Sequence, residues 1–198
     1  MKSGKIIWKR VALLLAGAVV LCGLIGLAYY TLQGPLRSAL NAQYWKTDPV
    51  QAAEVARTLI DFDLPPGYQP EKVMKFKEEM ADAVIIVSQA HPSDLIYISR
   101  TPDGILANDA WRTRYEERGA QAIADLLYDT ETISTTTTTV RGQSTTLRLL
   151  EGTDKNGQAV KQLACMFEGK SGEILLVMVA SQATWDQEMV DDFLKSIR

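Results

Sequence analysis

The stretch "EILLVMVA", residues 173–180, decides the fold. Its apolar side chains occupy successive positions rather than alternate ones, so a strand formed here would be apolar on both faces. Such a strand belongs in the middle of a sheet that is covered on both sides. A covered sheet needs helices packed on it, and the rest of the chain must supply them.

Two of these helices have clear beginnings. The first begins at Asp48, a capping residue followed by Pro49 at the first helical position. The last begins with a capping box formed by Thr184 and Gln187. Each carries an apolar stripe at helical spacing. The stripes are Ala52, Val55, Ala56, Leu59 and Ile60 in the first helix, and Trp185, Met189, Val190, Phe193, Leu194 and Ile197 in the last.

Residues 108–128 have the pattern of a third helix. Arg112 and Glu116 form an i,i+4 pair on it, which favours a solvated face over a binding patch. Segments rich in β-branched and aromatic residues, bounded by turn formers, predict strands on either side. These strands are residues 72–76, 83–89 and 95–100 before the helix, and residues 158–167 near the end of the chain.

The threonine-rich segment "ISTTTTTVRGQSTTLRLL", residues 133–150, predicts a hairpin. Threonine is β-branched and favours strands, and Gly142 supplies a turn in the middle. We expect threonine side chains to face one another across the two strands. A disordered or sugar-bearing linker is the alternative.

These elements predict an α+β fold. We expect a mostly antiparallel sheet of about six to seven strands with helices packed on it, preceded by one N-terminal transmembrane helix. The predicted organisation is a basic cytoplasmic stub at 1–10, a membrane anchor at 11–30, a spacer at 31–47 and an extracytoplasmic domain at 48–198.

The final third of the chain resembles the α/β/α sandwich of the PsbP-like family. The segments that carry the resemblance are "VRGQSTTLRLL", "GQAVKQLACMF", "EILLVMVASQ" and "TWDQEMVDDFLKSI", within residues 140–198. In that family a glycine-marked hairpin, two long strands and a closing helix follow in the same order. The resemblance implies a fold and a tendency to act in binding or assembly, and it supplies no catalytic residue.

The anchor prediction rests on residues 11–30, which carry no charge and as a helix would be about 30 Å long. Lys2, Lys5, Lys9 and Arg10 precede them, so the positive-inside rule places the N-terminus in the cytoplasm and the domain outside. The residues expected to lie in the membrane or at its surface are Val11, Leu14, Leu21, Leu24, Leu27, Tyr29 and Tyr30.

Other interpretations of this segment differ in strength. Acylation of Cys22 as a lipoprotein is disfavoured because Leu21 precedes it in place of a small residue. Cleavage after Ala28 stays open, since Gly26 and Ala28 fit a small-residue cleavage site. Ala18, Cys22 and Gly26 recur every four residues, a stripe that would let two helices approach closely and form a homodimer. Small residues are also common in membrane helices that stay single.

Charge and cysteine content exclude several classes of function. All 24 acidic residues and all but four of the 21 basic ones lie beyond residue 30, which gives this part a net charge of −7. Such a balance disfavours nucleic acid as a partner. With two cysteines, Cys22 and Cys165, the chain has neither a disulfide framework nor a cysteine-based zinc site. We expect Cys165 to be a small buried residue.

The sequence contains no motif for catalysis or cofactor binding. His91, the one histidine, stands beside Ser93 and Asp94 in a segment that predicts a turn, and adjacent residues do not take up the geometry of a catalytic triad. Phosphate-binding glycine loops and zinc-binding histidine motifs are absent. We therefore predict no cofactor and no metal. Asp61 and Asp63 would make a weak cation site at best.

The sequence thus predicts a single-pass membrane protein whose outer domain is a non-catalytic binding, assembly or sensing module near the membrane. Its expected partners are the lipid bilayer and a protein or small ligand, and a short basic N-terminus with one anchor suggests a bacterial envelope. Trp45, Tyr68 and Trp111 are candidate anchors for a partner if exposed, although core packing is the simpler expectation. An extracytoplasmic hydrolase that uses carboxylates is the alternative.

Overall fold

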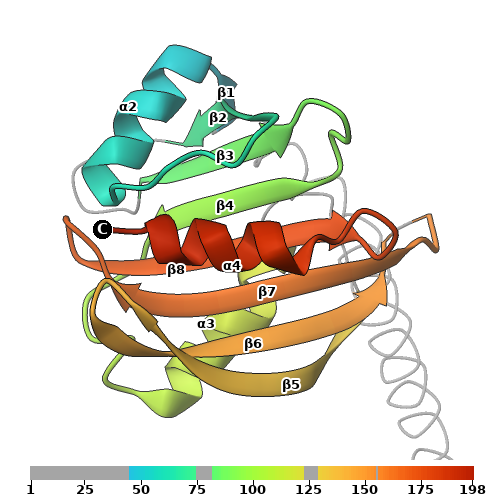
Figure 1. Ribbon diagram of the computed structural model, residues 1–198. Coiled ribbons are helices and arrows are strands. Elements are labelled where there is room, and N and C mark those ends of the chain that lie inside the picture. Colours follow the sequence, from blue (N-terminus) through green and yellow to red (C-terminus); the bar gives the residue numbers. More distant parts are fainter. Residues whose placement is uncertain (1–44, 75–81, 123–128, 155) are drawn as a thin grey trace, which may run out of the picture. The chain divides into compact units, whose positions relative to one another are not determined.

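The computed structural model describes residues 45–198, except residues 75–81, 123–128 and 155. This part contains eight strands and three helices (Figure 1). The strands are β1 Trp45–Thr47, β2 Tyr68–Met74, β3 Ala83–Ser88, β4 Leu95–Arg100, β5 Asp129–Val140, β6 Gln143–Thr153, β7 Ala159–Glu168 and β8 Glu173–Ser181. The helices are α2 Pro49–Leu59, α3 Asp109–Ala122 and α4 Gln187–Ser196.

All eight strands form one sheet in the order β1-β2-β3-β4-β8-β7-β6-β5, and every neighbouring pair is antiparallel. Each half of the sheet is a run of strands consecutive in sequence. The halves join where β4 pairs with β8, from Leu95 opposite Val179 to Arg100 opposite Ile174. Strand β1 lies at one edge of the sheet and β5 at the other (Figure 1).

Strand β8 lies inside the sheet and is buried on both faces, as its sequence predicts. All of its residues except Ser181 are buried. Alternate side chains enter two separate clusters, so that Leu176 and Met178 point to one face of the sheet and Val177 and Val179 to the other. The covered central strand is confirmed.

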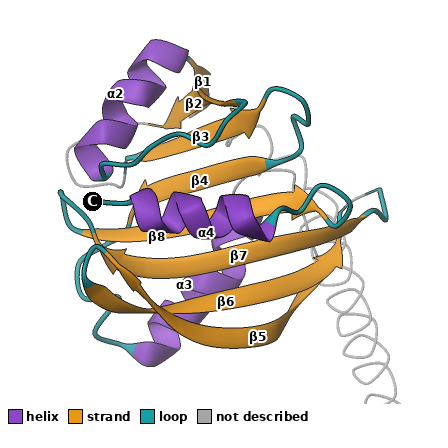
Figure 2. Cartoon of the chain, in the orientation of Figure 1, coloured by secondary structure: helices purple, strands orange, loops and turns teal. Residues whose placement is uncertain are grey.

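Helices cover both faces of the sheet (Figure 2). Helices α2 and α4 pack on one face, called the α2/α4 face below, where Leu59 and Phe193 join the same apolar cluster as Ile98 and Phe167. Helix α3 contacts β6, β7 and β8 on the opposite face, called the α3 face. Tyr115 of α3 packs there against a second cluster. The prediction of helices packed on the sheet holds for both faces.

One helix start is as predicted and one is not. Asp48 caps α2 by accepting a hydrogen bond from the Gln51 amide at 3.0 Å. Helix α4, however, is capped by Asp186, which accepts from the Met189 amide at 3.1 Å. The predicted capping box at Thr184 does not form because the Thr184 amide donates instead to the Ser181 hydroxyl, which closes the turn after β8.

The predicted α+β class with six to seven strands is wrong. The described part is mostly sheet, with three helices, and that sheet has eight strands. The additional strand is β1, which lies in the segment assigned to a spacer. Three residues are too few to show a periodic pattern, and β1 exists because Trp45 pairs with Met74 and its ring packs edge-on against Tyr97.

The predicted transmembrane helix is not part of the observed fold. Residues 11–30 lie outside the described residues. Within the described ranges, no helix is long and apolar enough to cross a membrane.

Candidate functional site

Strand β5 forms a free edge of the sheet and is far longer than the opposite edge strand. It has 12 residues and is paired along one side, with β6. Strand β1, at the other edge, has three residues and includes the charged Lys46. Short, charged edges resist pairing with another chain, whereas a long uncharged edge offers a row of backbone donors and acceptors.

The hairpin that carries this edge is closed by a two-residue turn. Val140 pairs with Gln143, and both intervening residues have positive φ, 52° at Arg141 and 74° at Gly142. A turn of this kind matches the twist of the flanking strands. Thr138 lies opposite Thr145 and Thr137 opposite Thr146. The predicted hairpin and its facing threonines are confirmed.

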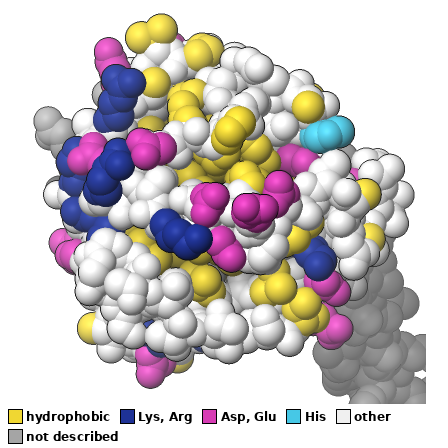
Figure 3. Space-filling model, viewed as in Figure 1, with side chains coloured by type: hydrophobic (Ala, Val, Ile, Leu, Met, Phe, Trp, Pro, Cys, Tyr) yellow, Lys and Arg dark blue, Asp and Glu magenta, His cyan; other side chains and the backbone are white. Residues whose placement is uncertain are grey.

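Most side chains of β5 between Glu131 and Thr139 lie in solvent, on both faces of the strand. Residues 131–137 are all exposed, and so is Thr139. The segment from Thr132 to Val140 carries no charge. On the face shown in Figure 3, the surface over β5 and β6 is correspondingly poor in charged side chains. The edge is therefore open from the side and from both faces.

A bulge interrupts the strand near its beginning. The register with β6 shifts between Thr132 and Ser134, which leaves Ile133 as the extra residue. The Ile133 side chain is 45% exposed, among the most exposed large apolar side chains of the described part. A bulge bends the strand locally, so the regular edge begins at Ser134.

Side chains tie the tip of the hairpin to β7. The ladder between β6 and β7 begins at Leu147, several residues after the turn. Beyond it, Arg141 Nη1 donates to the backbone oxygen of Glu168 at 2.9 Å. The Glu168 amide in turn donates to Gln143 Oε1 at 3.1 Å. These bonds fix the position of the hairpin tip relative to β7.

A buried ion pair supports the middle of the hairpin from below. Arg148 of β6 donates from Nε to Glu116 Oε2 at 2.5 Å and from Nη2 to Thr113 Oγ1 at 2.7 Å, both on α3. The Glu116 side chain is fully buried and that of Arg148 is 15% exposed. Because Arg148 lies opposite Thr135 in register, this contact anchors β6 directly behind the centre of β5.

The predicted pair between Arg112 and Glu116 does not form. Arg112 pairs with Asp109 at 2.7 Å, while Glu116 turns into the protein toward Arg148. Burial raises the pKa of Glu116, and the hydrogen bond from Arg148 opposes this shift. Glu116 is thus a structural carboxylate rather than part of a solvated face.

The candidate partner anchors differ in exposure. Trp111 of α3 is 49% exposed, with the Arg114 guanidinium 5.6 Å from the centre of its ring. Trp45 packs against Tyr97, and Tyr68 packs against the cluster on the α2/α4 face. Core packing therefore holds for two of the three, and Trp111 alone of these three has a large exposed surface.

The residues predicted for the membrane anchor lie outside the part that the structure describes. They are Val11, Leu14, Leu21, Leu24, Leu27, Tyr29 and Tyr30, together with the small-residue stripe Ala18, Cys22 and Gly26.

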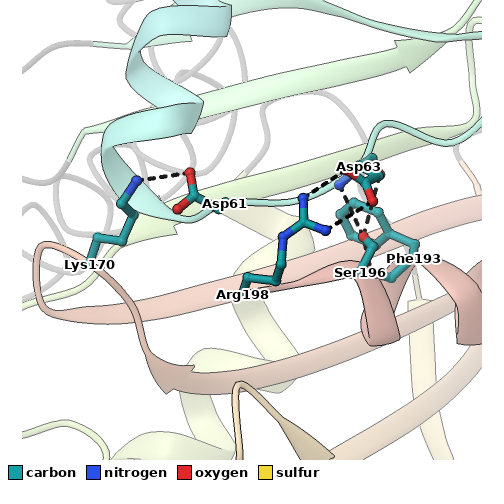
Figure 4. Close-up of polar contacts among 6 residues, drawn as sticks. All are labelled: Asp61, Asp63, Lys170, Phe193, Ser196 and Arg198. Atoms are coloured by element: carbon teal, nitrogen blue, oxygen red, sulfur yellow. Dashed lines mark hydrogen bonds and ion pairs between the residues drawn. The ribbon is translucent and has the colours of Figure 1, made fainter.

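Asp61 and Asp63, weak candidates for a cation site, are each matched by a basic side chain (Figure 4). Lys170 Nζ donates to Asp61 Oδ1 at 2.8 Å. Arg198 donates to both oxygens of Asp63, at 2.8 and 3.2 Å. These contacts tie the segment after α2 to the β7–β8 turn and to the C-terminal residue. Within the described part, no group of three or more His, Cys, Asp or Glu residues could hold a metal ion.

The Asp61 contact leads to a testable prediction. The hydrogen bond from Lys170 is the largest influence that lowers the pKa of Asp61. We expect Lys170→Met to raise that pKa toward its ordinary value and Arg198→Met to raise it less, as measured by carbon-detected NMR titration. Because the folded pKa lies below the unfolded one, the stability contributed by Asp61 is present above about pH 4 and lost as the pH falls further. Equal shifts in the two variants would contradict this assignment.

His91 and Cys165 occupy the places that the sequence predicts. His91 is exposed in the turn between β3 and β4, where its amide donates to the Ser88 hydroxyl. Its neighbour Asp94 is buried and accepts from the Ser181 amide at 3.2 Å, a bond that links the turn before β4 to the end of β8. Cys165 is a fully buried free cysteine, and burial raises its pKa. None of these contacts resembles a nucleophile with its base.

Sequence reasoning predicted the threonine-rich hairpin but not its place at the edge of the sheet. The signal that was available is the absence of charge from Thr132 to Val140 between Glu131 and Arg141. Edge strands are commonly protected by charged side chains, so a long uncharged segment that turns out to lie at an edge is unusual.

Comparisons with known proteins do not assign a family. No family model matches the chain, and no curated protein matches it. Among solved structures the chain is similar to the apo structure of the immunity protein TplEi of T6SS from Pseudomonas aeruginosa, with 18% sequence identity and a TM-score of 0.39. The similarity covers 67% of this chain and 45% of that one, so this chain spans less than half of that protein. A similarity at this level carries no argument about function, and the resemblance to the PsbP-like family stays a prediction.

Proposed function

We propose that this protein is a non-catalytic module that binds other proteins by strand addition along β5, in an accessory role such as assembly, scaffolding or sensing. The observation that carries the proposal is the free edge of β5, a strand of 12 residues whose segment from Thr132 to Thr139 carries no charge and is mostly exposed. In strand addition the backbone of an extended segment continues the sheet, and its side chains fall on both faces of the edge strand. The exposure of β5 on both faces leaves room for them.

The alternation of hydrogen-bonded and non-hydrogen-bonded pairs along the hairpin identifies which backbone groups of β5 point to the free edge. In a hairpin with a two-residue turn, the pair beside the turn exchanges both hydrogen bonds, and the pairs then alternate along the ladder. Val140 and Thr138 therefore direct their amides to β6, whereas Thr137 and Thr135 direct theirs to the free edge. These outward groups would bind the partner strand.

The proposed location is the outer surface of a membrane. Its support is the sequence alone: the basic residues before residue 11 and the uncharged stretch 11–30. The excess of acidic residues in the rest of the chain favours a protein partner over nucleic acid.

Site-specific photocrosslinking tests the proposal. A photoreactive residue that replaces Ile133, on the edge, is expected to crosslink to a partner protein. The crosslinked segment of that partner should have the extended conformation of a β-strand. The same residue placed at Val50 of α2, which is 72% exposed, is the matched control and should form none of these adducts. Crosslinks to the same proteins, in the same yield, from both positions would contradict the proposal.

Thr137→Pro provides the second arm of this test. Proline lacks the amide that Thr137 directs to the free edge and is tolerated in edge strands. We expect it to abolish the adducts formed at position 133, whereas Thr137→Val, which keeps the amide and the β-branched shape, should preserve them. Circular dichroism of both variants verifies that the hairpin is intact. Adducts that persist in a folded Thr137→Pro variant would rule out strand addition.

The hydrolase alternative stays a prediction from sequence. The described carboxylate with a raised pKa is Glu116, and it is sealed from solvent and bound to Arg148. No observation on this carboxylate favours catalysis.

A further inference from the structure

The strand that β5 receives must be complementary to it, and the threonine-rich segment of β5 can pair favourably with a second copy of itself. We infer that the partner is a second copy of this chain, with the two β5 strands antiparallel about a two-fold axis at Thr136. This inference rests on the proposed function, because it names the partner of the same edge.

A two-fold axis places the same surface on both sides of an interface, so the edge must match itself. With Thr136 opposite its own copy, Thr135 lies opposite Thr137 and Ser134 opposite Thr138 of the second chain. Thr135 and Thr137 are the residues that direct backbone groups outward, so the pair between them is hydrogen bonded. Every side chain in this central stretch is a threonine or serine, and such pairs are favourable across antiparallel strands.

Charge selects this register. Beyond the bulge at Ile133, this register brings Glu131 of one chain toward the hairpin turn of the other, which carries Arg141, and the symmetry repeats this approach at the opposite end. These two residues are the charged positions that bracket the uncharged stretch. A shift of the axis to Thr137 would place Arg141 opposite Ile133 and lose both ion pairs. Arg141 donates to the Glu168 backbone oxygen of β7 in the single chain, so pairing with Glu131 of the second chain requires its side chain to exchange this contact for one at the free edge.

Among the residues that the structure describes, none covers the free edge of β5. Helix α3 lies against β6, β7 and β8, and residues 131–137 of β5 are exposed on both faces. The bulge at Ile133 falls at each end of the shared ladder rather than in its centre. The regular stretch from Ser134 to Thr138 therefore pairs without interruption, and the two sheets become one continuous sheet.

Disulfide trapping in the full chain, solubilised in detergent, tests the inference. All variants carry Cys22→Ser, which removes one of the two native cysteines. The other, Cys165, can stay because it is fully buried and cannot form a disulfide between chains. Thr136→Cys faces its own copy in a non-hydrogen-bonded pair, where the Cα atoms lie about 4.5 Å apart, within the range of a disulfide. We expect it to form a covalent dimer under mild oxidation. Ser134→Cys is the matched control: it lies on the same face of β5, about 14 Å from its own copy, and should stay monomeric.

A charge exchange supplies an independent readout. Glu131→Arg and Arg141→Glu, each alone, place like charges opposite each other at both ends and should lower the yield of the Thr136→Cys dimer several-fold. The double exchange should restore it. A yield that is the same in all three variants, or crosslinking at Ser134→Cys as strong as at Thr136→Cys, would overturn the inference.

The failure of this inference is distinguishable from failure of the proposed function. If Thr136→Cys forms no dimer while adducts at Ile133 still depend on Thr137, the edge binds a different protein and the self-pairing is wrong. If the adducts are lost as well, strand addition itself is wrong. A dimer that persists in Thr137→Pro is held together elsewhere in the chain and also overturns the inference.

Discussion

Replacing Arg148 with methionine is expected to destabilise the domain by about 3–5 kcal/mol at pH 7, because it leaves the buried carboxylate of Glu116 without its cation. The Glu116 side chain is fully buried, and Arg148 donates to it at 2.5 Å. Urea unfolding of the full chain in detergent, followed by tryptophan fluorescence, measures the effect. Lys161→Met, which breaks a partly exposed pair with Glu151 between β6 and β7, is the control and should cost about 1 kcal/mol or less.

The pH dependence of this variant gives a second check. Burial raises the pKa of Glu116 in the folded state, so the stability linked to this group is fully present below the ordinary glutamate pKa of about 4.3 and is lost as the pH rises through the folded value. Without Arg148 the folded pKa rises further, and the loss of stability should be larger at pH 7 than at pH 4.5. A loss that does not change with pH would show that Glu116 is not the cause.

A double variant separates charge from packing. Glu116→Leu together with Arg148→Met removes both charges and fills the space with apolar atoms, which is often neutral or stabilising for a buried ion pair. We therefore expect the double variant to recover most of the stability lost in Arg148→Met. If it remains equally unstable, the Arg148 side chain contributes through its contacts with Thr113 rather than through Glu116.

Gly169→Ala is the second substitution with a large expected effect. A Cβ atom at this position would overlap the Ile174 side chain and lie 2.8 Å from the backbone oxygen of Leu59. That oxygen also accepts from the Lys170 amide at 2.8 Å, so it cannot move away without breaking the bond. We expect a loss of about 1–3 kcal/mol or more, typical of an overpacked core.

Gly157→Ala is the matched control for this substitution. Gly157 has a φ of +76° with open space around it, so an alanine there meets backbone strain of about 1–2 kcal/mol and no clash. Urea unfolding should show the same dependence on denaturant for both variants and a lower midpoint for Gly169→Ala. A smaller loss at Gly169 than at Gly157 would mean that the end of α2 moves freely relative to the β7–β8 turn.

The features predicted correctly from the sequence are those determined by local pattern. The two apolar faces of β8 follow from consecutive large apolar residues, and the hairpin follows from threonine and Gly142. The start of α2 follows from Asp48 and Pro49, whose capping geometry involves neighbouring residues alone. In each case the signal and the structure lie within the same short segment.

The features that were missed depend on partners distant in sequence. Strand β1 is defined by pairing with β2 rather than by its own three residues. Glu116 has a neighbour of opposite charge one helical turn away in Arg112, but it pairs with Arg148 on a strand. The candidate site was missed for the same reason, because a strand becomes an edge only through the order of the whole sheet.

The junction between β4 and β8 has a consequence for how the chain folds. Strands β1 to β4 and β5 to β8 each pair with their neighbours in sequence, so each half closes short loops. The ladder from Leu95 opposite Val179 to Arg100 opposite Ile174 brings together two strands that are separated in sequence by α3 and by β5, β6 and β7. Closing so long a loop costs more conformational entropy than any other pairing in the sheet. We therefore expect the two halves to form before the ladder between β4 and β8, which joins them into one sheet.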